Sequence, residues 1–181
     1  ALDPADDGDL QFSIAPDAER PHALRFKVFT RRPMSLTEVL PHLGVLGVEV
    51  TDERPFEWDL RGDRVHVYDF GLRLPDDLPA EWDADDRARF RAAFAASYRG
   101  LAHPGKMNRL VMTAKLTWQQ VSWLRGIGRY LQQAGIPFSQ FYVADALTEY
   151  PAIAAALVDA FETKFDPARG RPTKELISMA G

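Results

Sequence analysis

The 181-residue chain is predicted to be an α+β protein, in which an antiparallel sheet with two helices precedes an all-helical segment. Four stretches before residue 75 alternate apolar and polar residues, as half-buried strands do. Two other stretches before residue 100 have helical periodicity, and only helical periods follow. The charge changes at the same place, since residues 1–98 hold 12 basic and 20 acidic groups (net −8) and residues 99–181 hold 10 and 6 (net +4).

The first two predicted strands cover residues 10–14 and 24–28, and a long loop containing two prolines joins them as a hairpin. A helix over residues 35–46 follows. Ser35 and Glu38 have the spacing of a capping box, Pro41 should kink or shorten the helix, and Gly47 should stop it. The predicted apolar stripe of this helix is Leu36, Val39, Leu40 and Leu43.

The next two strands are predicted at residues 48–60 and 65–70, with a turn at 61–63. Pro55 lies inside the first of them, which predicts a bulge or an edge position there. A helix over residues 83–99 then begins at Asp83, a suitable N-cap, and ends at Gly100.

Four helices are predicted after residue 100, over residues 106–115, 117–133, 139–150 and 151–166. Thr117 and Gln120 form a second capping box, and Pro151 suits the first turn of the last helix. The predicted core stripes are Trp118, Val121, Leu124, Ile127 and Leu131 in one helix and Ile153, Leu157 and Phe161 in the last.

The expected domains are therefore an α+β domain over residues 1–100, a helical segment over 101–167 and a linker or tail over 168–181. The element order β-β-α-β-β-α suits a ferredoxin-like sheet of the kind that ACT regulatory domains use. The fourth strand of that plan, after the second helix, is missing. We expect the extra N-terminal strand to take its place at the edge of the sheet.

Composition excludes several classes of function. The chain has no cysteine, so disulfides, thiolate metal sites and cysteine nucleophiles are excluded. Net charge −4 argues against a nucleic-acid partner, and no apolar run approaches the ~18 residues of a membrane span. The histidines lack a ligand spacing, and no nucleophile elbow or phosphate-binding loop occurs, so we expect no catalytic, cofactor-binding or metal-binding residues.

Two places suggest binding. Arg31, Arg32 and Ser35 lie between a strand end and a helix N-terminus, where donors and the helix dipole can hold the carboxylate of an amino-acid effector. An ordinary exposed turn is the alternative. Trp123 falls outside the core stripe of its helix, which suggests an interface with another subunit or another domain.

The carboxylates at Asp52, Glu53, Glu57 and Asp59 are open to two interpretations. A pair of them could act as general acid and base in a small enzyme, which requires a pocket and strongly shifted pKa values. The simpler interpretation is the solvent-facing side of a twisted sheet.

Residues 34–56, MSLTEVLPHLGVLGVEVTDERPF, resemble a stretch of the bacterial large NAD-dependent glutamate dehydrogenases that lies upstream of the catalytic domain. Further similar stretches follow in the same order, so that the resemblance covers roughly residues 24–167. These stretches are His66–Phe70, Asn108–Val111, Leu116–Val121, Leu124–Arg125, Arg129–Gln133, Pro137–Gln140 and Phe161–Pro167.

The resemblance implies that this chain is the last ACT-type domain and the helical segment before the catalytic domain of a long polypeptide. The parent would convert L-glutamate and NAD to 2-oxoglutarate, ammonium and NADH in the cytoplasm. No residue here matches the glutamate-binding lysines or the nucleotide-binding glycines of the family. The segment would then contact other domains of its own chain, take part in a homo-oligomer and respond to an amino-acid effector, without binding NAD itself.

This sequence departs from the family pattern at two places. Residues 102–106, AHPGK, stand where the family has acidic residues. Gly126 and Gly128 stand where it has alanine and tyrosine, and two glycines inside a helix predict a close helix neighbour. The competing hypotheses are a free-standing amino-acid-sensing module of about this length and the small enzyme described above.

Overall fold

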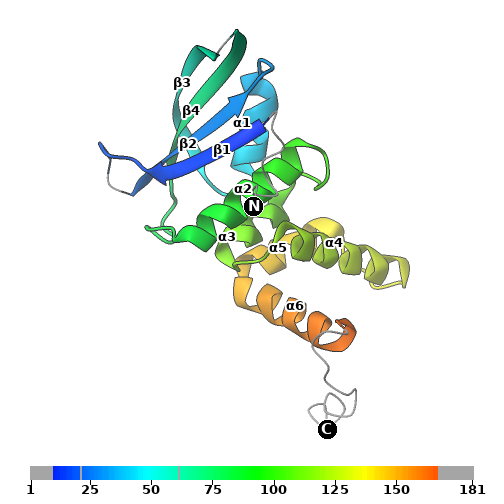
Figure 1. Cartoon of the computed structure of the whole chain (residues 1–181). Helices are drawn as coiled ribbons and strands as arrows, with labels where there is room; N and C mark the ends of the chain where they lie inside the picture. The colour runs from blue at the N-terminus through cyan, green and yellow to red at the C-terminus, as the bar shows by residue number, and fades with distance from the viewer. Residues whose placement is uncertain (1–9, 21, 61, 167–181) are drawn as a thin grey trace.

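The computed structural model describes residues 10–20, 22–60 and 62–166 of the chain, and Figure 1 shows their arrangement. The elements are β1 (Leu10–Pro16), β2 (Ala23–Thr30), α1 (Leu36–Gly44), β3 (Glu49–Leu60), β4 (Asp63–Arg73), α2 (Ala84–Tyr98), the 3-10 helix η1 (Lys106–Arg109), α3 (Leu110–Thr113), α4 (Trp118–Gln133), α5 (Gln140–Glu149) and α6 (Pro151–Phe165). We call residues 10–98 the sheet part and residues 106–165 the helical part. The predicted tail at 168–181 lies outside the described residues.

The four strands form one antiparallel sheet in the order β1-β2-β4-β3. β1 pairs with β2 from Leu10 opposite Thr30 to Pro16 opposite Leu24, at the edge where the missing fourth strand would pair. The predicted replacement is confirmed. β3 forms the other edge, which accommodates Pro55, while the register shifts between Val50 and Asp52 instead.

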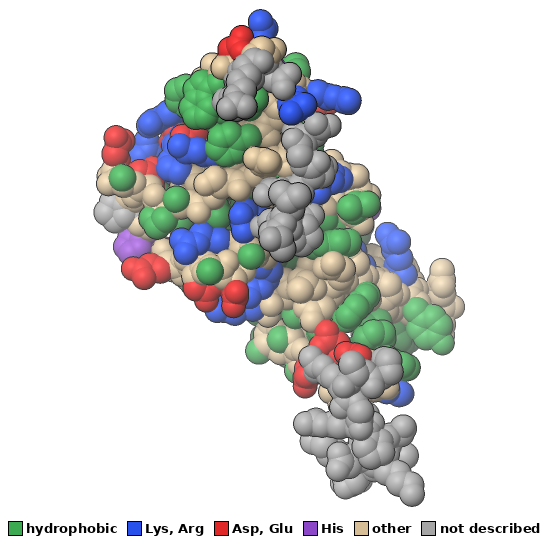
Figure 2. Space-filling view, viewed as in Figure 1, with side chains coloured by type: hydrophobic (Ala, Val, Ile, Leu, Met, Phe, Trp, Pro, Cys, Tyr) green, Lys and Arg blue, Asp and Glu red, His purple; other side chains and the backbone are tan. Residues whose placement is uncertain are grey.

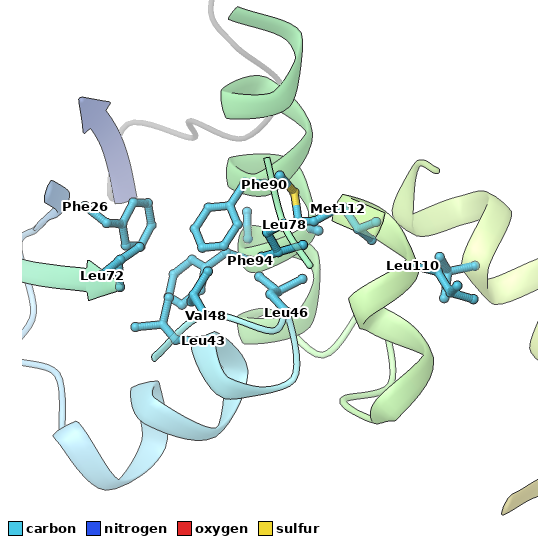
Figure 3. Packing of buried hydrophobic residues seen from close by; sticks show 14 of the residues in the cluster. Phe26, Leu43, Leu46, Val48, Leu72, Leu78, Phe90, Phe94, Leu110 and Met112 are labelled. Carbon is cyan, nitrogen blue, oxygen red and sulfur yellow. The ribbon is translucent and has the colours of Figure 1, made fainter. Parts of the chain in front are cut away.

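α1 and α2 pack on the same face of the sheet and enclose the main core, which Figure 3 shows. Phe26 of β2 makes an edge-to-face contact with Phe94 of α2, with ring centroids 5.1 Å apart. Phe12 of β1 meets the same Phe94 ring at 5.4 Å. The extra strand therefore completes the core as well as the sheet, because its alternate side chains add to the apolar face that the helices cover.

The three predicted helix starts differ in their caps. Asp83 accepts the Asp86 backbone N–H at 2.7 Å, and Thr117 accepts that of Gln120 at 3.2 Å, each within a complete capping box. Ser35 is the N-cap of α1, but its side chain makes no capping bond, so the box predicted there is wrong. Ser35 is exposed, and water can satisfy the first-turn N–H groups in place of its hydroxyl.

Several predicted stripe residues are exposed. Leu36 and Leu40 of α1 and Leu131 of α4 each expose 39% of their surface, whereas Val39, Leu43, Val121 and Leu124 are buried. In α6 the predicted core stripe is wrong, because Ala154 and Val158 are the buried residues. Apolar residues repeat every four positions on two adjacent faces of α6. The face that begins with Ala154 allows the rest of the molecule to approach the helix more closely, because the alanine side chain is small.

η1 and α3 replace the single helix predicted at residues 106–115, and they form the centre of the helical part. Met107, Leu110, Val111 and Met112 are buried there. The close neighbour expected at the two glycines of α4 exists at one of them. A Cβ on Gly128 would lie 3.3 Å from the side chain of Gln140 on α5. A Cβ on Gly126 would have no atom of a neighbouring element within 4 Å.

α5 and α6 meet at an angle of 106° around Tyr150, so that α6 projects from the molecule (Figure 1). In the described ranges, no single helix combines the length and the apolar composition needed to cross a membrane. Taken together, the bent pair α5 and α6 meets that criterion by length and composition only.

Candidate functional site

The predicted effector residues lie together on the connection between β2 and α1. Arg31, Arg32 and Ser35 are exposed. The Thr30 hydroxyl accepts the Arg32 N–H at 3.2 Å and donates to the Arg32 carbonyl at 3.0 Å, which fixes the turn. The Met34 N–H donates to the Tyr68 hydroxyl at 2.9 Å, which ties the connection to β4. The structure brings the three residues into one exposed loop, and effector binding by them stays a prediction.

A different group of charged residues is more highly organised, on the face of the sheet opposite to the helices. Arg25 of β2 donates through Nε to Asp69 at 2.8 Å and through one terminal nitrogen to Asp52 at 2.6 Å. Its other terminal nitrogen donates to the Asp69 carbonyl at 2.8 Å. Arg20 donates to the second Asp52 oxygen, also at 2.8 Å. We call Arg20, Arg25, Asp52 and Asp69 the ionic cluster.

Gly71 makes room for the ionic cluster. It lies opposite both Arg25 and Asp52 in the register. A Cβ at this position would overlap an Asp52 carboxylate oxygen and would come within 2.7 Å of the Thr51 hydroxyl and 2.9 Å of an Arg25 nitrogen. A glycine inside a strand signals such close approach. That signal was present in the sequence, but the partners across the sheet were not readable from it.

The four carboxylates considered for catalysis do not form an acid–base pair. Asp52 lies in the ionic cluster, where hydrogen bonding to Arg25 lowers its pKa to about 2. A general acid that works at neutral pH needs a raised pKa, so Asp52 does not suit that role. Glu57 lies 3.4 Å from the His66 ring, and Asp59 accepts the Gly62 N–H at 2.8 Å. Strand alternation puts Glu57 and Asp59 on the other face from Asp52.

Among the described residues, no group of three or more histidine, aspartate or glutamate side chains is placed to hold a metal ion. His42 instead packs between α1 and α2. Its Nδ1 lies 2.7 Å from the Ser97 hydroxyl, and burial lowers its pKa.

Arg109 joins the sheet part to the helical part. Its guanidinium donates through Nε to Asp77 at 3.1 Å and lowers the pKa of that carboxyl through hydrogen bonding. Its stem crosses Gly47, where a Cβ would lie 3.1 Å from the Arg109 Cγ. Gly47 also has a φ of +87°, a left-handed conformation that favours glycine. Gly47, which was predicted to stop the helix, therefore has a second role, because its lack of a side chain leaves room for Arg109.

Trp123, the predicted interface residue, lies on α4 with 40% of its surface exposed. Its ring contacts Phe161 of α6, with centroids 5.6 Å apart, and Phe161 contacts Phe165 at 4.8 Å. These rings, with Glu162 and Asp166, line a hollow of about 260 Å³. The prediction that Trp123 lies outside the core is confirmed, whereas Phe161, which was predicted to lie in the core, is half-buried beside it.

The helical part exposes more large apolar residues than the sheet part, and Figure 2 shows hydrophobic side chains gathered at the lower right of the molecule. Phe141 exposes 84% of its surface, and Phe138 stacks on Tyr142 at 5.0 Å between centroids while both are exposed. Isolated apolar residues are normal on a protein surface, but contiguous patches mark contact sites. The exposed set in the helical part is Trp123, Tyr130, Leu131, Ile136, Phe138, Phe141, Tyr142, Tyr150, Ile153, Leu157 and Phe165.

A sheet of this topology, with both of its helices on one face and a helical part attached, defines an ACT-type domain with a helical extension. Residues 9–87 match the family description "Glutamate dehydrogenase, ACT3 domain", and residues 104–167 match "Glutamate dehydrogenase, helical motif 3". The chain belongs to the glutamate dehydrogenase family.

Three similar curated proteins are NAD-specific glutamate dehydrogenases. The chain is 41% identical to that of Mycobacterium tuberculosis over 141 residues, which is 75% of this chain. It is 35% identical to that of Halomonas elongata over 83% of this chain, and 33% identical to that of Pseudomonas aeruginosa over 80%. In each case the match spans 9% of the relative's length.

Proposed function

We propose that this chain is a non-catalytic regulatory and oligomerisation segment of a NAD-dependent glutamate dehydrogenase. The parent enzyme, in the cytoplasm, would convert L-glutamate and NAD to 2-oxoglutarate, ammonium and NADH with residues outside this chain. The observation that carries the proposal is the pair of family matches, which cover the sheet part and the helical part in order, while the chain spans 9% of the relatives' length.

The chemistry of the described residues supports a non-catalytic role. Asp52 is tied to Arg25, and its pKa of about 2 keeps it ionised at neutral pH. Asp77 is held by Arg109 in the same way. These groups form structural ion pairs and leave NAD binding and proton transfer to other parts of the parent enzyme.

Self-association is supported by the two edges of the sheet. Within the described ranges, β1 and β3 each have a neighbouring strand on one side only, and an unpaired strand edge is a ready template for a second chain. On β3, Phe56 and Trp58 expose 47% and 53% of their surface near the hairpin end. We therefore assign homo-oligomer contacts to the sheet part.

The mass of the natural polypeptide tests the proposal first. An antibody raised against this chain should detect a band many times larger than 20.4 kDa in cell extract, and the immunoprecipitate should reduce NAD with L-glutamate. A natural product near 20 kDa would contradict the proposal and favour the free-standing amino-acid-sensing module.

The effector role has a separate test in the full-length enzyme. Common amino acids other than the substrate L-glutamate are titrated by calorimetry, and their effect on the rate is measured for wild type, Arg32→Ala and the matched control Arg129→Ala, which removes an exposed arginine from α4. We expect Arg32→Ala to lose both the heat of binding and the rate response, while the control keeps them. If no amino acid gives heat and Arg32→Ala leaves the kinetics unchanged, the effector site is refuted.

A further inference from the structure

α6 is a largely apolar helix that the molecule holds by a narrow face. Of its fifteen residues, Ala154 and Val158 are the buried ones. The side chains next to that face form a stripe of Ile153, Leu157, Phe161 and Phe165, which we call the α6 stripe. Ile153, Leu157 and Phe165 expose 54%, 48% and 60% of their surface. A helix with so much exposed apolar surface needs another element against it.

The α6 stripe is continuous with the hollow beside Trp123. Phe161 contacts the Trp123 ring on one side and the Phe165 ring on the other. A hydrogen bond of 2.6 Å from the Gln120 side chain to Glu162 fixes α6 against α4 at this point. The surface is thus shaped before any partner arrives, which lowers the entropic cost of docking.

We propose that the α6 stripe and the Trp123 hollow are covered by a segment of the same polypeptide downstream of residue 181. This inference rests on the proposed function, since it requires the longer parent chain. The relatives are about eleven times longer than their match to this chain, so most of such a polypeptide lies outside it. Asp166, from which the chain continues, itself lines the hollow.

Chain length keeps the downstream segment close. The fifteen residues 167–181 can span at most about 50 Å when fully extended, and α6 itself is about 22 Å long. A segment that begins at the end of this connection meets the stripe at the high effective concentration of an intramolecular partner, on the order of millimolar. Docking in the same chain therefore needs no large intrinsic affinity.

The charges near the stripe disfavour a lipid surface. The described charged residues of α6 and its C-cap are Asp159, Glu162, Lys164 and Asp166, which sum to −2. Helices that lie on membranes carry lysine and arginine along their polar face and are attracted to anionic lipids. An apolar face of a neighbouring protein segment suits this surface better.

Photo-cross-linking in the full-length enzyme tests the inference. Leu157, or in a second variant Ile153, is replaced by p-benzoylphenylalanine, and the matched control has the same residue at Ala152, an exposed position on another side of α6. Unlabelled chains of each variant are mixed during assembly with ¹⁵N-labelled wild-type chains, so that mass spectrometry separates links within one chain from links between two. Only variants that retain glutamate dehydrogenase activity are irradiated.

We expect the stripe positions to link to a peptide downstream of residue 181 in the same chain, and we expect this product to be absent from the control. A link between two chains, to residues upstream of 181, to lipid or to another protein would overturn the inference, as would the absence of any link. An active enzyme without the expected link refutes the docking alone. A natural polypeptide near 20 kDa refutes the docking together with the proposed function.

Discussion

The sheet part and the helical part differ in how far their aromatic residues are buried. In the sheet part, Phe26, Phe90 and Phe94 are fully buried, and the Phe26 ring contacts each of the other two edge to face. In the helical part, Phe138, Phe141 and Phe165 are exposed by half or more. The sheet encloses its own core, whereas the helices after α3 leave apolar faces for a partner. The larger buried core therefore lies in the sheet part, and most of the exposed large apolar residues lie in the helical part.

The largest expected effect on stability is the loss of a buried ring, which is compared with the loss of an exposed leucine. Phe94→Ala should lower the free energy of unfolding by about 3 to 5 kcal/mol, because it opens a cavity among Phe12, Phe26 and Tyr98. Leu157→Ala should change it by less than about 0.5 kcal/mol in this 181-residue chain. Urea unfolding measures both. Equal losses would show that α6 is as well packed as the sheet.

Two glycines sharpen the comparison through the backbone. Gly71→Ala should cost about 1 to 3 kcal/mol, because the new methyl group must displace Asp52, Thr51 or Arg25. Gly126→Ala should instead stabilise the chain by about 1 kcal/mol, because alanine is the better helix former and its Cβ would have no atom of a neighbouring element within 4 Å. Thermal unfolding of both variants tests this, and a loss at Gly126 would reveal a neighbour there.

Acid should weaken the sheet part through Asp52. Its pKa is about 2 in the folded state, below the ordinary 3.8, so its contribution is complete above pH 3.8 and is lost as the pH falls towards 2. We expect roughly 1 to 2 kcal/mol, after allowing for the partial exposure of the carboxylate. Asp52→Asn should flatten the stability profile between pH 4 and pH 2. An unchanged profile would show that the titration of Asp52 does not contribute to the loss of stability in acid.

The smallest expected effect is the difference in stability between the loss of Thr117 and the loss of Ser35, two N-cap residues with the same sequence pattern. Thr117→Ala removes an observed cap and should cost about 1 kcal/mol. Ser35→Ala removes a hydroxyl that makes no capping bond, and its cost should stay within a few tenths of a kcal/mol. Chemical denaturation of the two variants measures the difference. Similar losses would mean that Ser35 caps α1 in solution.

Most of the fold could be predicted from the sequence because its signals are local. Alternation at Leu10 and Phe12 predicted β1, and its place at the edge followed from the missing fourth strand. Asp83 and Thr117 marked helix starts that the structure confirms. Where a local pattern was ambiguous, the prediction failed: the repeat at Ile153 and Leu157 has an equivalent at Ala154 and Val158, and only packing chose between them.

The ionic cluster was less predictable, because its residues are joined across the sheet. Arg25, Asp52 and Asp69 come from three strands, and the register places them together. The bulge between Val50 and Asp52 changes the face on which Asp52 lies, and no residue pattern indicated it. Arg109 likewise reaches Asp77 and Gly47 only after the two parts pack.

The sequence by itself determined the strands and helices, the edge position of β1 and the family to which the chain belongs. These depend on neighbours along the chain and on ordered motifs, which are written in the order of residues. Only the tertiary structure decided which apolar stripe is buried, where the ionic cluster forms and that Trp123 and α6 share an uncovered surface. Those outcomes depend on contacts between distant residues, whose free energies are set by close packing and burial, not by local periodicity.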